Sequence, residues 1–145
     1  MSDGGQQASK ARVLVVDDEP AHRQLVAAAL AHCQDLELAG EAFHGKRGVE
    51  QAAELQPDVI VLDLRMPVMD GLTALPLIRR AAPLARVLVW SGNGELDMER
   101  AREAGAWGWL GKVSPVEHLV ALLRAAAQHS PWDQAIEATL LADGS

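Results

Sequence analysis

Five side chains that could bind a metal, attack phosphorus or pair charges stand at or just beyond the ends of short apolar runs: Asp17, Asp18, Asp63, Ser91 and Lys112. Carboxylates that share a site repel one another, and a hard divalent cation with oxygen ligands, such as Mg²⁺, relieves that repulsion. A carboxylate can also act as a nucleophile toward a phosphoryl group. Such a transfer needs cations to neutralise the phosphoryl oxygens, and Lys112 could supply one of them.

These side chains must be brought together by secondary structure. The four aliphatic residues before Asp63 are typical of a strand buried on both faces of a parallel sheet. We predict strands at 13–16, 36–42, 59–62, 86–90 and 106–110, and helices at 20–33, 45–55, 71–82, 96–104 and 115–128. Asp70 is the expected N-cap of the third helix, and Gly40 weakens the second strand.

Regular alternation of strands and helices predicts an α/β fold, a doubly wound five-stranded parallel sheet with five flanking helices. In such a sheet the carboxyl ends of the strands share one edge, where ligands bind. Asp17 and Asp18 end the first strand, Asp63 the third, Ser91 the fourth, and Lys112 follows the fifth. We therefore expect one site at this edge.

The chain of 145 residues is expected to form one domain at 11–128, after a disordered leader at 1–10. Residues 129–145 are expected to form a short tail or linker helix. There, Ser130 and Pro131 suggest a capping box with proline at the first helical position. Trp132, Ile136 and Leu140 follow at helical spacing.

Charge and composition exclude several classes. A net charge of −7 argues against direct nucleic-acid binding by this chain. No apolar run is long enough for a membrane span, and the first twelve residues lack the apolar core of a secretory signal. Cys33 has no partner for an internal disulfide, which fits a cytoplasmic location. The five histidines show no metal-ligand spacing and are expected at the surface.

Four motifs in order resemble the response-regulator receiver domain of two-component signalling. They are the acid pair Asp17-Asp18, the segment PDVIVLDLRMPVMDG at 57–71, Ser91 at the end of a strand, and GAWGWLGK at 105–112. The resemblance covers about 11–128 and implies a flavodoxin-like sheet with strand order 2-1-3-4-5. The last motif is similar to the subfamily that carries a LuxR-type helix-turn-helix output domain.

The resemblance implies a role for each matching residue. Asp63 is the phosphoacceptor. Asp17 and Asp18 hold Mg²⁺ together with Asp63 and the backbone carbonyl of Arg65. Lys112 pairs with the phosphoryl group.

It also implies that Ser91 bonds a phosphoryl oxygen and moves inward, with Trp109 as the aromatic residue that rotates with it. Arg65 and Asn93 occupy the positions that tune dephosphorylation. The family usually has Tyr or Phe where Trp109 stands, and Trp90 replaces a residue that is commonly aliphatic.

The implied function is a phosphoacceptor switch that is phosphorylated by a sensor histidine kinase and catalyses only its own phosphorylation and dephosphorylation. Its output is expected to be transcription through a DNA-binding domain absent from this chain, with homodimerisation on phosphorylation. A stand-alone receiver acting on a protein partner, or a phosphorylation-independent interaction module, is the alternative.

Two other classes fit less well. A haloacid-dehalogenase-like phosphatase uses an Asp-x-Asp pattern after its first strand, and this chain has Asp17-Asp18-Glu19-Pro20 there. A flavodoxin-like cofactor binder needs backbone donors for a phosphate at that place, where the acids would repel it.

Overall fold

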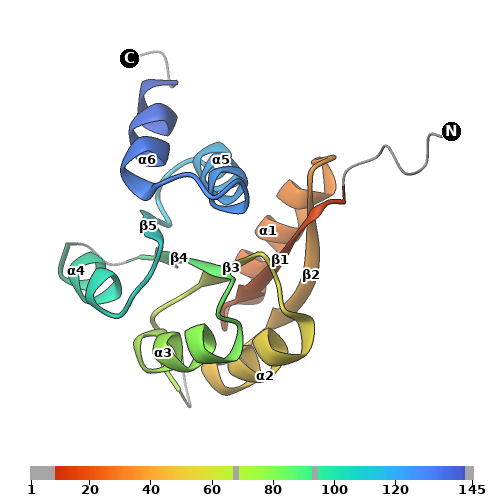
Figure 1. Cartoon of the computed structure of the whole chain (residues 1–145), viewed down its shortest axis with the longest axis vertical. Helices are drawn as coiled ribbons and strands as arrows, with labels where there is room; N and C mark the ends of the chain where they lie inside the picture. The colour runs from red at the N-terminus through yellow and green to blue at the C-terminus, as the bar shows by residue number, and fades with distance from the viewer. Residues whose placement is uncertain (1–8, 67–68, 93–94, 143–145) are drawn as a thin grey trace, which may run out of the picture.

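The computed structural model describes residues 9–66, 69–92 and 95–142. Its centre is one parallel sheet in the order β2-β1-β3-β4-β5, which confirms the expected α/β class and strand order (Figure 1). The strands are β1 (Ala11–Val16), β2 (Leu36–Ala42), β3 (Val59–Leu62), β4 (Arg86–Ser91) and β5 (Gly108–Gly111).

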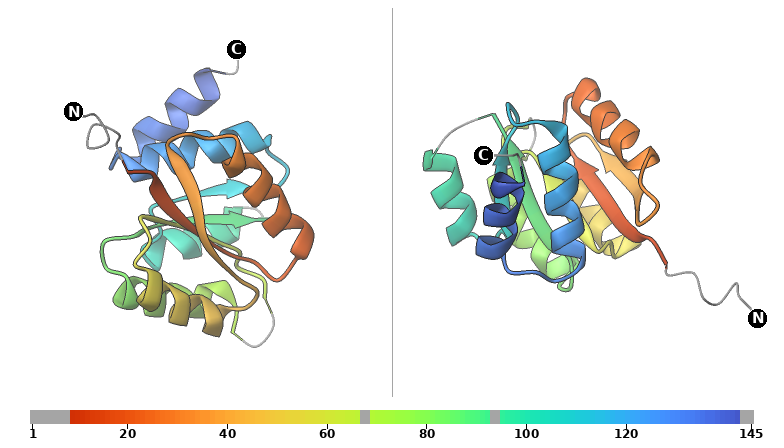
Figure 2. Two further views of the ribbon diagram at one scale, coloured as in Figure 1. Left: turned by 90° about the vertical axis from the view of Figure 1, so that its right-hand side faces the viewer. Right: turned by 90° about the horizontal axis from the view of Figure 1, so that it is seen from above.

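Helices cover both faces of the sheet (Figure 2). They are α1 (Pro20–Ala31), α2 (Gly45–Leu55), α3 (Gly71–Ala81), α4 (Glu95–Glu103), α5 (Val116–Ala127) and α6 (Trp132–Leu141). Helices α1 and α5 pack on one face, and α2 and α3 pack on the other. None of the helices in the described ranges is long and apolar enough to cross a membrane.

Alternate residues of the two central strands supply the two cores. Val13 and Val15 of β1 face the α1–α5 core, whereas Leu14 and Val16 face the α2–α3 core. Because side chains alternate across a strand, a strand buried on both faces must be apolar throughout. This explains why the sequence before the acids shows continuous apolar runs. The buried strands hold those acids in fixed positions at the edge of the sheet.

Element bounds differ from the predictions where local turns replace regular structure. Helix α1 ends at Ala31 instead of Cys33, because Cys33 donates its backbone N–H to the carbonyl three residues back, closing a tighter turn. Strand β5 begins at Gly108 instead of Ala106, because the N–H of Ala106 donates to the carbonyl of Ala101 in α4. The Asp70 cap is confirmed, since its carboxylate accepts from the Thr73 N–H at 2.8 Å.

Gly40 marks an irregularity in β2 and not the absence of a strand. The register between β1 and β2 shifts between Val13 and Leu14, the position that faces Gly40. A Cβ at Gly40 would lie 2.7 Å from side-chain atoms of Gln51 and Leu55 in α2. Glycine therefore lets α2 pack closely on this strand.

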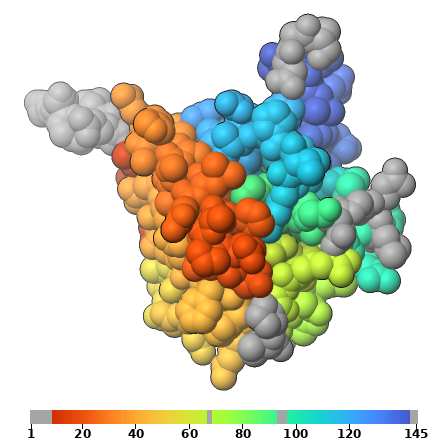
Figure 3. All heavy atoms as spheres, turned by 180° about the vertical axis from the view of Figure 1, so that it is seen from behind, coloured from red at the N-terminus to blue at the C-terminus, as the bar shows by residue number. Residues whose placement is uncertain are grey.

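Helix α6 packs against α5 and the edge strand β5 (Figure 2, right). The predicted capping box is wrong: Pro131 is the N-cap and no side chain caps the helix. Ser130 is engaged elsewhere, since its carbonyl accepts from Trp107 Nε1 at 2.8 Å and its N–H donates to the Ala125 carbonyl. Figure 3 shows α6 standing beside α5 at one end of the molecule.

Candidate functional site

Three carboxylates meet at the carboxyl edge of the sheet. Each of Asp17, Asp18 and Asp63 offers an oxygen atom within 4.8 Å of the others. Asp17 and Asp63 are buried, and Asp18 is half-buried. Backbone hydrogen bonds extend the sheet to this point, with the N–H of Asp63 donating to the Val16 carbonyl at 2.9 Å. The two acidic strand ends are thereby held side by side.

The carboxylate of Asp17 is oriented by its own loop. Its Oδ1 accepts from the backbone N–H of Glu19 at 2.9 Å. Arg23 of α1 donates to the Asp17 backbone carbonyl at 2.6 Å. With Oδ1 engaged, Oδ2 is the atom that Asp17 presents to the site.

Lys112 supplies the positive charge of the site. Its Nζ lies 2.7 Å from Asp17 Oδ2 and 3.3 Å from Asp63 Oδ2. The Lys112 N–H donates to the Ser91 carbonyl at 3.0 Å, which continues the β4–β5 pairing beyond the strands. The side chain is only 13% exposed, so water screens these ion pairs weakly.

Burial raises the pKa of Asp63 above the ordinary value of 3.8. The neighbouring charge of Asp17 raises this pKa further, while Lys112 and the Arg65 N–H oppose the shift. The Arg65 N–H lies 3.3 Å from Asp63 Oδ1. The positive charge present therefore does not fully compensate the buried carboxylates, and a second cation at this edge would lower the pKa of Asp63.

Ser91 brings a hydroxyl to the same edge. The residue is buried, and its Oγ finds no hydrogen-bond partner within the part of the chain that is described. Buried hydroxyl groups are normally satisfied, and an unsatisfied one asks for an explanation such as a missing ligand. Ser91 thus keeps a donor available at the carboxyl edge.

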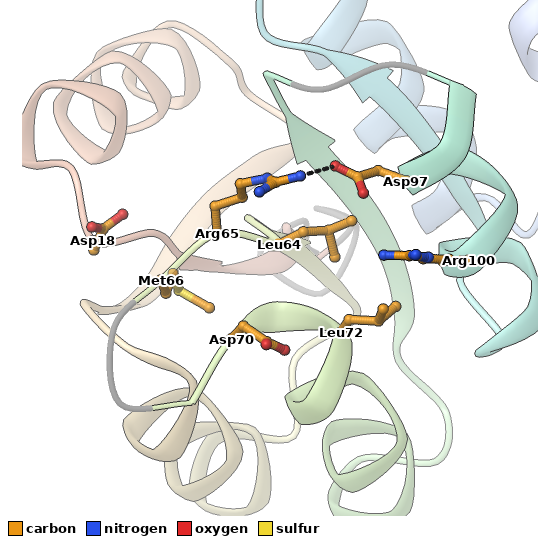
Figure 4. A pocket seen from close by; sticks show the side chains of 8 residues that line it. All are labelled: Asp18, Leu64, Arg65, Met66, Asp70, Leu72, Asp97 and Arg100. Carbon is orange, nitrogen blue, oxygen red and sulfur yellow. Dashed lines mark hydrogen bonds and ion pairs between the residues drawn. The ribbon is translucent and has the colours of Figure 1, made fainter.

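A cavity of about 480 Å³ opens beside the carboxylates, between the loop after β3 and helix α4 (Figure 4). It is lined by Asp18, Leu64, Arg65, Met66, Asp70, Leu72, Asp97 and Arg100. Arg65 reaches across it to Asp97 of α4, with 3.3 Å between Nη2 and Oδ2. Asp97 was not anticipated, because nothing in the spacing of α4 distinguishes it from its charged neighbours. Asn93 lies outside the described residues.

Trp109 of β5 lies on the side of the sheet that faces α4. It packs against a small buried cluster of Leu64, Val89 and Ala101. Leu64 directly follows Asp63 in the chain, so this cluster connects Trp109 to the carboxylates. Its other neighbour is Trp132 of α6, with ring centroids 5.2 Å apart.

The expectation that all five histidines lie at the surface is wrong for His118, whereas His22 and His44 are half-buried and His32 and His129 are exposed. His118 is buried in α5, because it takes an inward position on that helix. His22 of α1 has its Nδ1 2.9 Å from Lys112 Nζ and 3.5 Å from Asp17 Oδ2. Its distance in sequence from Lys112 hid this contact. The only available signal was its place on the first turn of the helix that follows Asp17 and Asp18.

Comparisons with known proteins agree with this geometry. The model of the response regulator receiver domain family matches residues 13–124. The nitrate/nitrite response regulator protein NarL of Escherichia coli K12 is 38% identical over 134 residues, which cover 91% of this chain and 62% of that protein. A protein-glutamate methylesterase/protein-glutamine glutaminase of Maricaulis maris is 43% identical over 72% of this chain and 27% of its own.

Solved structures show the same architecture. The signal receiver domain of the NarL-type regulator from Mycobacterium tuberculosis superposes with a TM-score of 0.79 at 34% identity, covering 83% of this chain and 98% of that one. A LuxR-family response regulator from Aurantimonas gives 0.80 at 27% identity, covering 92% and 99%. The chain spans less than two thirds of the curated relatives named above. The sheet order, the acidic edge and these likenesses together place the chain in the response regulator receiver domain family.

Proposed function

We propose that Asp63 accepts a phosphoryl group in a Mg²⁺-dependent reaction and that this event switches the domain. As a receiver domain the chain is a phosphoacceptor switch of two-component signalling. The observation that carries the assignment of residues is the meeting of three carboxylates within 4.8 Å, with Lys112 bridging Asp17 and Asp63. Histidine kinases phosphorylate receiver domains, so the proposed donor is a phosphohistidine or a small phosphoramidate.

The donor set suits Mg²⁺, which prefers a few carboxylates, a carbonyl and water at close range. Asp17, Asp18, Asp63 and the backbone carbonyl of Arg65 are the proposed protein ligands. When bound, the ion would neutralise carboxylate repulsion and polarise a phosphoryl oxygen. The partly uncompensated charge of Asp63, seen in its raised pKa, supports a cation at this place.

The protein's own groups perform the remaining steps. An oxygen of the Asp63 carboxylate attacks phosphorus in line, a P–O bond forms, and the P–N bond to the donor breaks with its electron pair staying on nitrogen. Lys112 pairs with one phosphoryl oxygen, and the free hydroxyl of Ser91 donates to another. The domain thus catalyses its own phosphorylation and, through attack of water on the acyl phosphate, its own dephosphorylation.

Arg65 is proposed to tune the lifetime of the acyl phosphate. Its side chain is 67% exposed and forms an ion pair with Asp97 across the cavity. In this position it lines the cavity through which a water molecule or a phosphoryl donor would reach Asp63. The same role is proposed for Asn93.

We further propose that the output is transcription, with residues 11–128 as the receiver and 129–145 as a linker to an output domain. The likeness to NarL covers 91% of the chain and so extends beyond residues 13–124, which favours a shared arrangement over a receiver alone. Trp109 is the proposed switch residue, because it contacts both the cluster next to Asp63 and the first residue of α6. Homodimerisation on phosphorylation stays a prediction.

The test is intact mass after incubation with phosphoramidate, with and without Mg²⁺. Wild type and Asp133→Asn, an exposed acid at the start of α6, should each gain one phosphoryl group only when Mg²⁺ is present. Asp63→Asn should gain none, because its amide is not nucleophilic. An adduct on Asp63→Asn, or an adduct that forms equally without Mg²⁺, would contradict the proposal. Absence of any adduct would favour the phosphorylation-independent interaction module.

A further inference from the structure

His22 and Trp90 contact Lys112 in addition to the carboxylates, and His22 Nδ1 also lies 3.5 Å from Asp17 Oδ2. Lysine ammonium groups have only donors, so His22 Nδ1 at 2.9 Å must accept a hydrogen bond from Lys112 Nζ. The contact joins α1 to the loop after β5, residues 90 positions apart in the chain.

Trp90 packs against both Lys112 and His22. Lys112 Nζ lies 5.2 Å from the centroid of the Trp90 ring, within range of a cation–π interaction. The edge-to-face contact between His22 and Trp90 has 5.5 Å between centroids and an interplanar angle of 69°. Trp90 is 3% exposed and belongs to the α1–α5 core, so it cannot move away as a surface side chain could.

Unlike the carboxylates, His22 and Trp90 carry no negative charge, and this difference matters for phosphoryl transfer. Asp17 and Asp63 neutralise Lys112, and they are also the proposed ligands of the metal, which competes with Lys112 for them. An imidazole and an indole ring hold the ammonium group without cancelling its charge. Lys112 held by them stays at the site and stays available to a phosphoryl oxygen.

We propose that His22, packed against Trp90, is a positioning residue for phosphoryl transfer: it holds Lys112 beside Asp63 through a contact that does not itself neutralise the positive charge of the lysine. This inference rests on the proposed function and adds a residue to it. His22 acts through Lys112 and touches neither the donor nor the phosphorus atom. Its removal should therefore affect the transfer only while Lys112 is present.

The experiment compares rates of phosphorylation of the full chain by phosphoramidate at saturating Mg²⁺, followed by intact mass. His22→Leu removes the acceptor and should slow the reaction about tenfold, as expected when a hydrogen bond to a charged group is lost. His22→Asn places an amide oxygen near the former Nδ1 and should recover most of the rate. His32→Leu, at the exposed C-cap of the same helix, is the matched control and should match wild type.

Two further measurements separate positioning from a structural effect. In a Lys112→Ala background, His22→Leu should cause no additional loss, so the double-mutant cycle should be strongly non-additive. Mg²⁺ affinity, measured by titration of tryptophan fluorescence without any donor, should fall much less than the rate.

Each other outcome overturns the inference. If His22→Leu is phosphorylated as fast as wild type, Lys112 does not need His22 to hold it in place. If His22→Leu causes the same loss of rate with and without Lys112, His22 acts through another group. A drop in Mg²⁺ affinity as large as the drop in rate would place its action on the metal. A wild type that takes up no phosphoryl group would overturn the proposed function as well, whereas a phosphorylated wild type beside an unaffected His22→Leu overturns this inference alone.

Discussion

Among single residues, Asp63 makes folding stability depend on pH, because burial and the charge of Asp17 raise its pKa above 3.8. The folded state consequently keeps the proton of Asp63 to a higher pH than the unfolded chain does. Folding stability is then lost as pH rises from 3.8 through the folded pKa. A cation that bound these carboxylates in the folded state alone would stabilise the folded domain.

Asp63→Asn should therefore raise the melting temperature of the metal-free protein at neutral pH. A gain of roughly 3 °C corresponds to about 1 kcal/mol in a domain of this size. The gain should shrink as pH is lowered toward 3.8, and Mg²⁺ should stabilise wild type more than the variant. Melting curves from pH 4 to 8 provide the measurement, and a gain that is the same at every pH would contradict it.

Asp35→Asn is the control of opposite sign. The side-chain hydrogen bond from Arg124 lowers the pKa of Asp35 below 3.8, despite some opposing desolvation. Its contribution to stability is present above pH 3.8 and is lost as pH falls through the folded pKa. Asp35→Asn should lower the melting temperature slightly at neutral pH, because the pair is at the surface and screened by water.

At the scale of elements, the docking of α6 depends on one close approach to β5. Trp132 packs against Trp107 and Trp109, with ring centroids 5.3 and 5.2 Å away. Between them stands Gly108, where a Cβ would lie 2.2 Å from Trp132 Cε3. Only glycine leaves room for the indole, so the edge strand and the tail helix are matched to each other.

Gly108→Ala should undock α6, because the methyl group overlaps the Trp132 ring and overpacking is relieved by moving the helix. Hydrogen exchange should show faster exchange of amides in Trp132–Leu141, while the sheet stays protected. Gly111→Ala is the matched control in the same strand, since its Cβ would meet nothing closer than 3.9 Å. Equal protection of α6 in both variants would show that Trp132 does not anchor it.

At the scale of the whole molecule, a contiguous set of contacts links the carboxylates to the tail. Asp63 is followed by Leu64, which belongs to the buried cluster against which Trp109 packs, and Trp109 in turn contacts Trp132. Coupling requires that some element of this set has two arrangements with different contacts. Ser91, with its unsatisfied hydroxyl, and Trp109 are the residues proposed to provide them.

Phosphorylation should therefore shift amide signals over residues 91–112 and also in α6. Spectra of the isotope-labelled chain, recorded before and after phosphorylation confirmed by mass, provide the measurement. In Trp132→Ala the shifts over 91–112 should remain while those in α6 should largely disappear, because the ring contact with Trp109 is gone. An unchanged spectrum over 91–112 in wild type would contradict the switch.

The sheet, most of the helix positions and the residues of the acidic edge follow from local patterns in the sequence. Strands buried on both faces must be apolar along their whole length, so β1 and β3 were visible as continuous runs. The carboxyl ends of parallel strands also share one edge, so the sequence alone predicts that Asp17, Asp63 and Lys112 lie together, as the ion pairs of Lys112 show.

Contacts between distant side chains were decided only by the tertiary structure. His22 and Lys112 are far apart in sequence, as are Arg65 and Asp97, and no local periodicity records such pairs. The capping pattern at Ser130 was overridden because its backbone groups are used by Trp107 and Ala125. Local patterns report which face of an element is buried, whereas the partner across an interface depends on how whole elements pack.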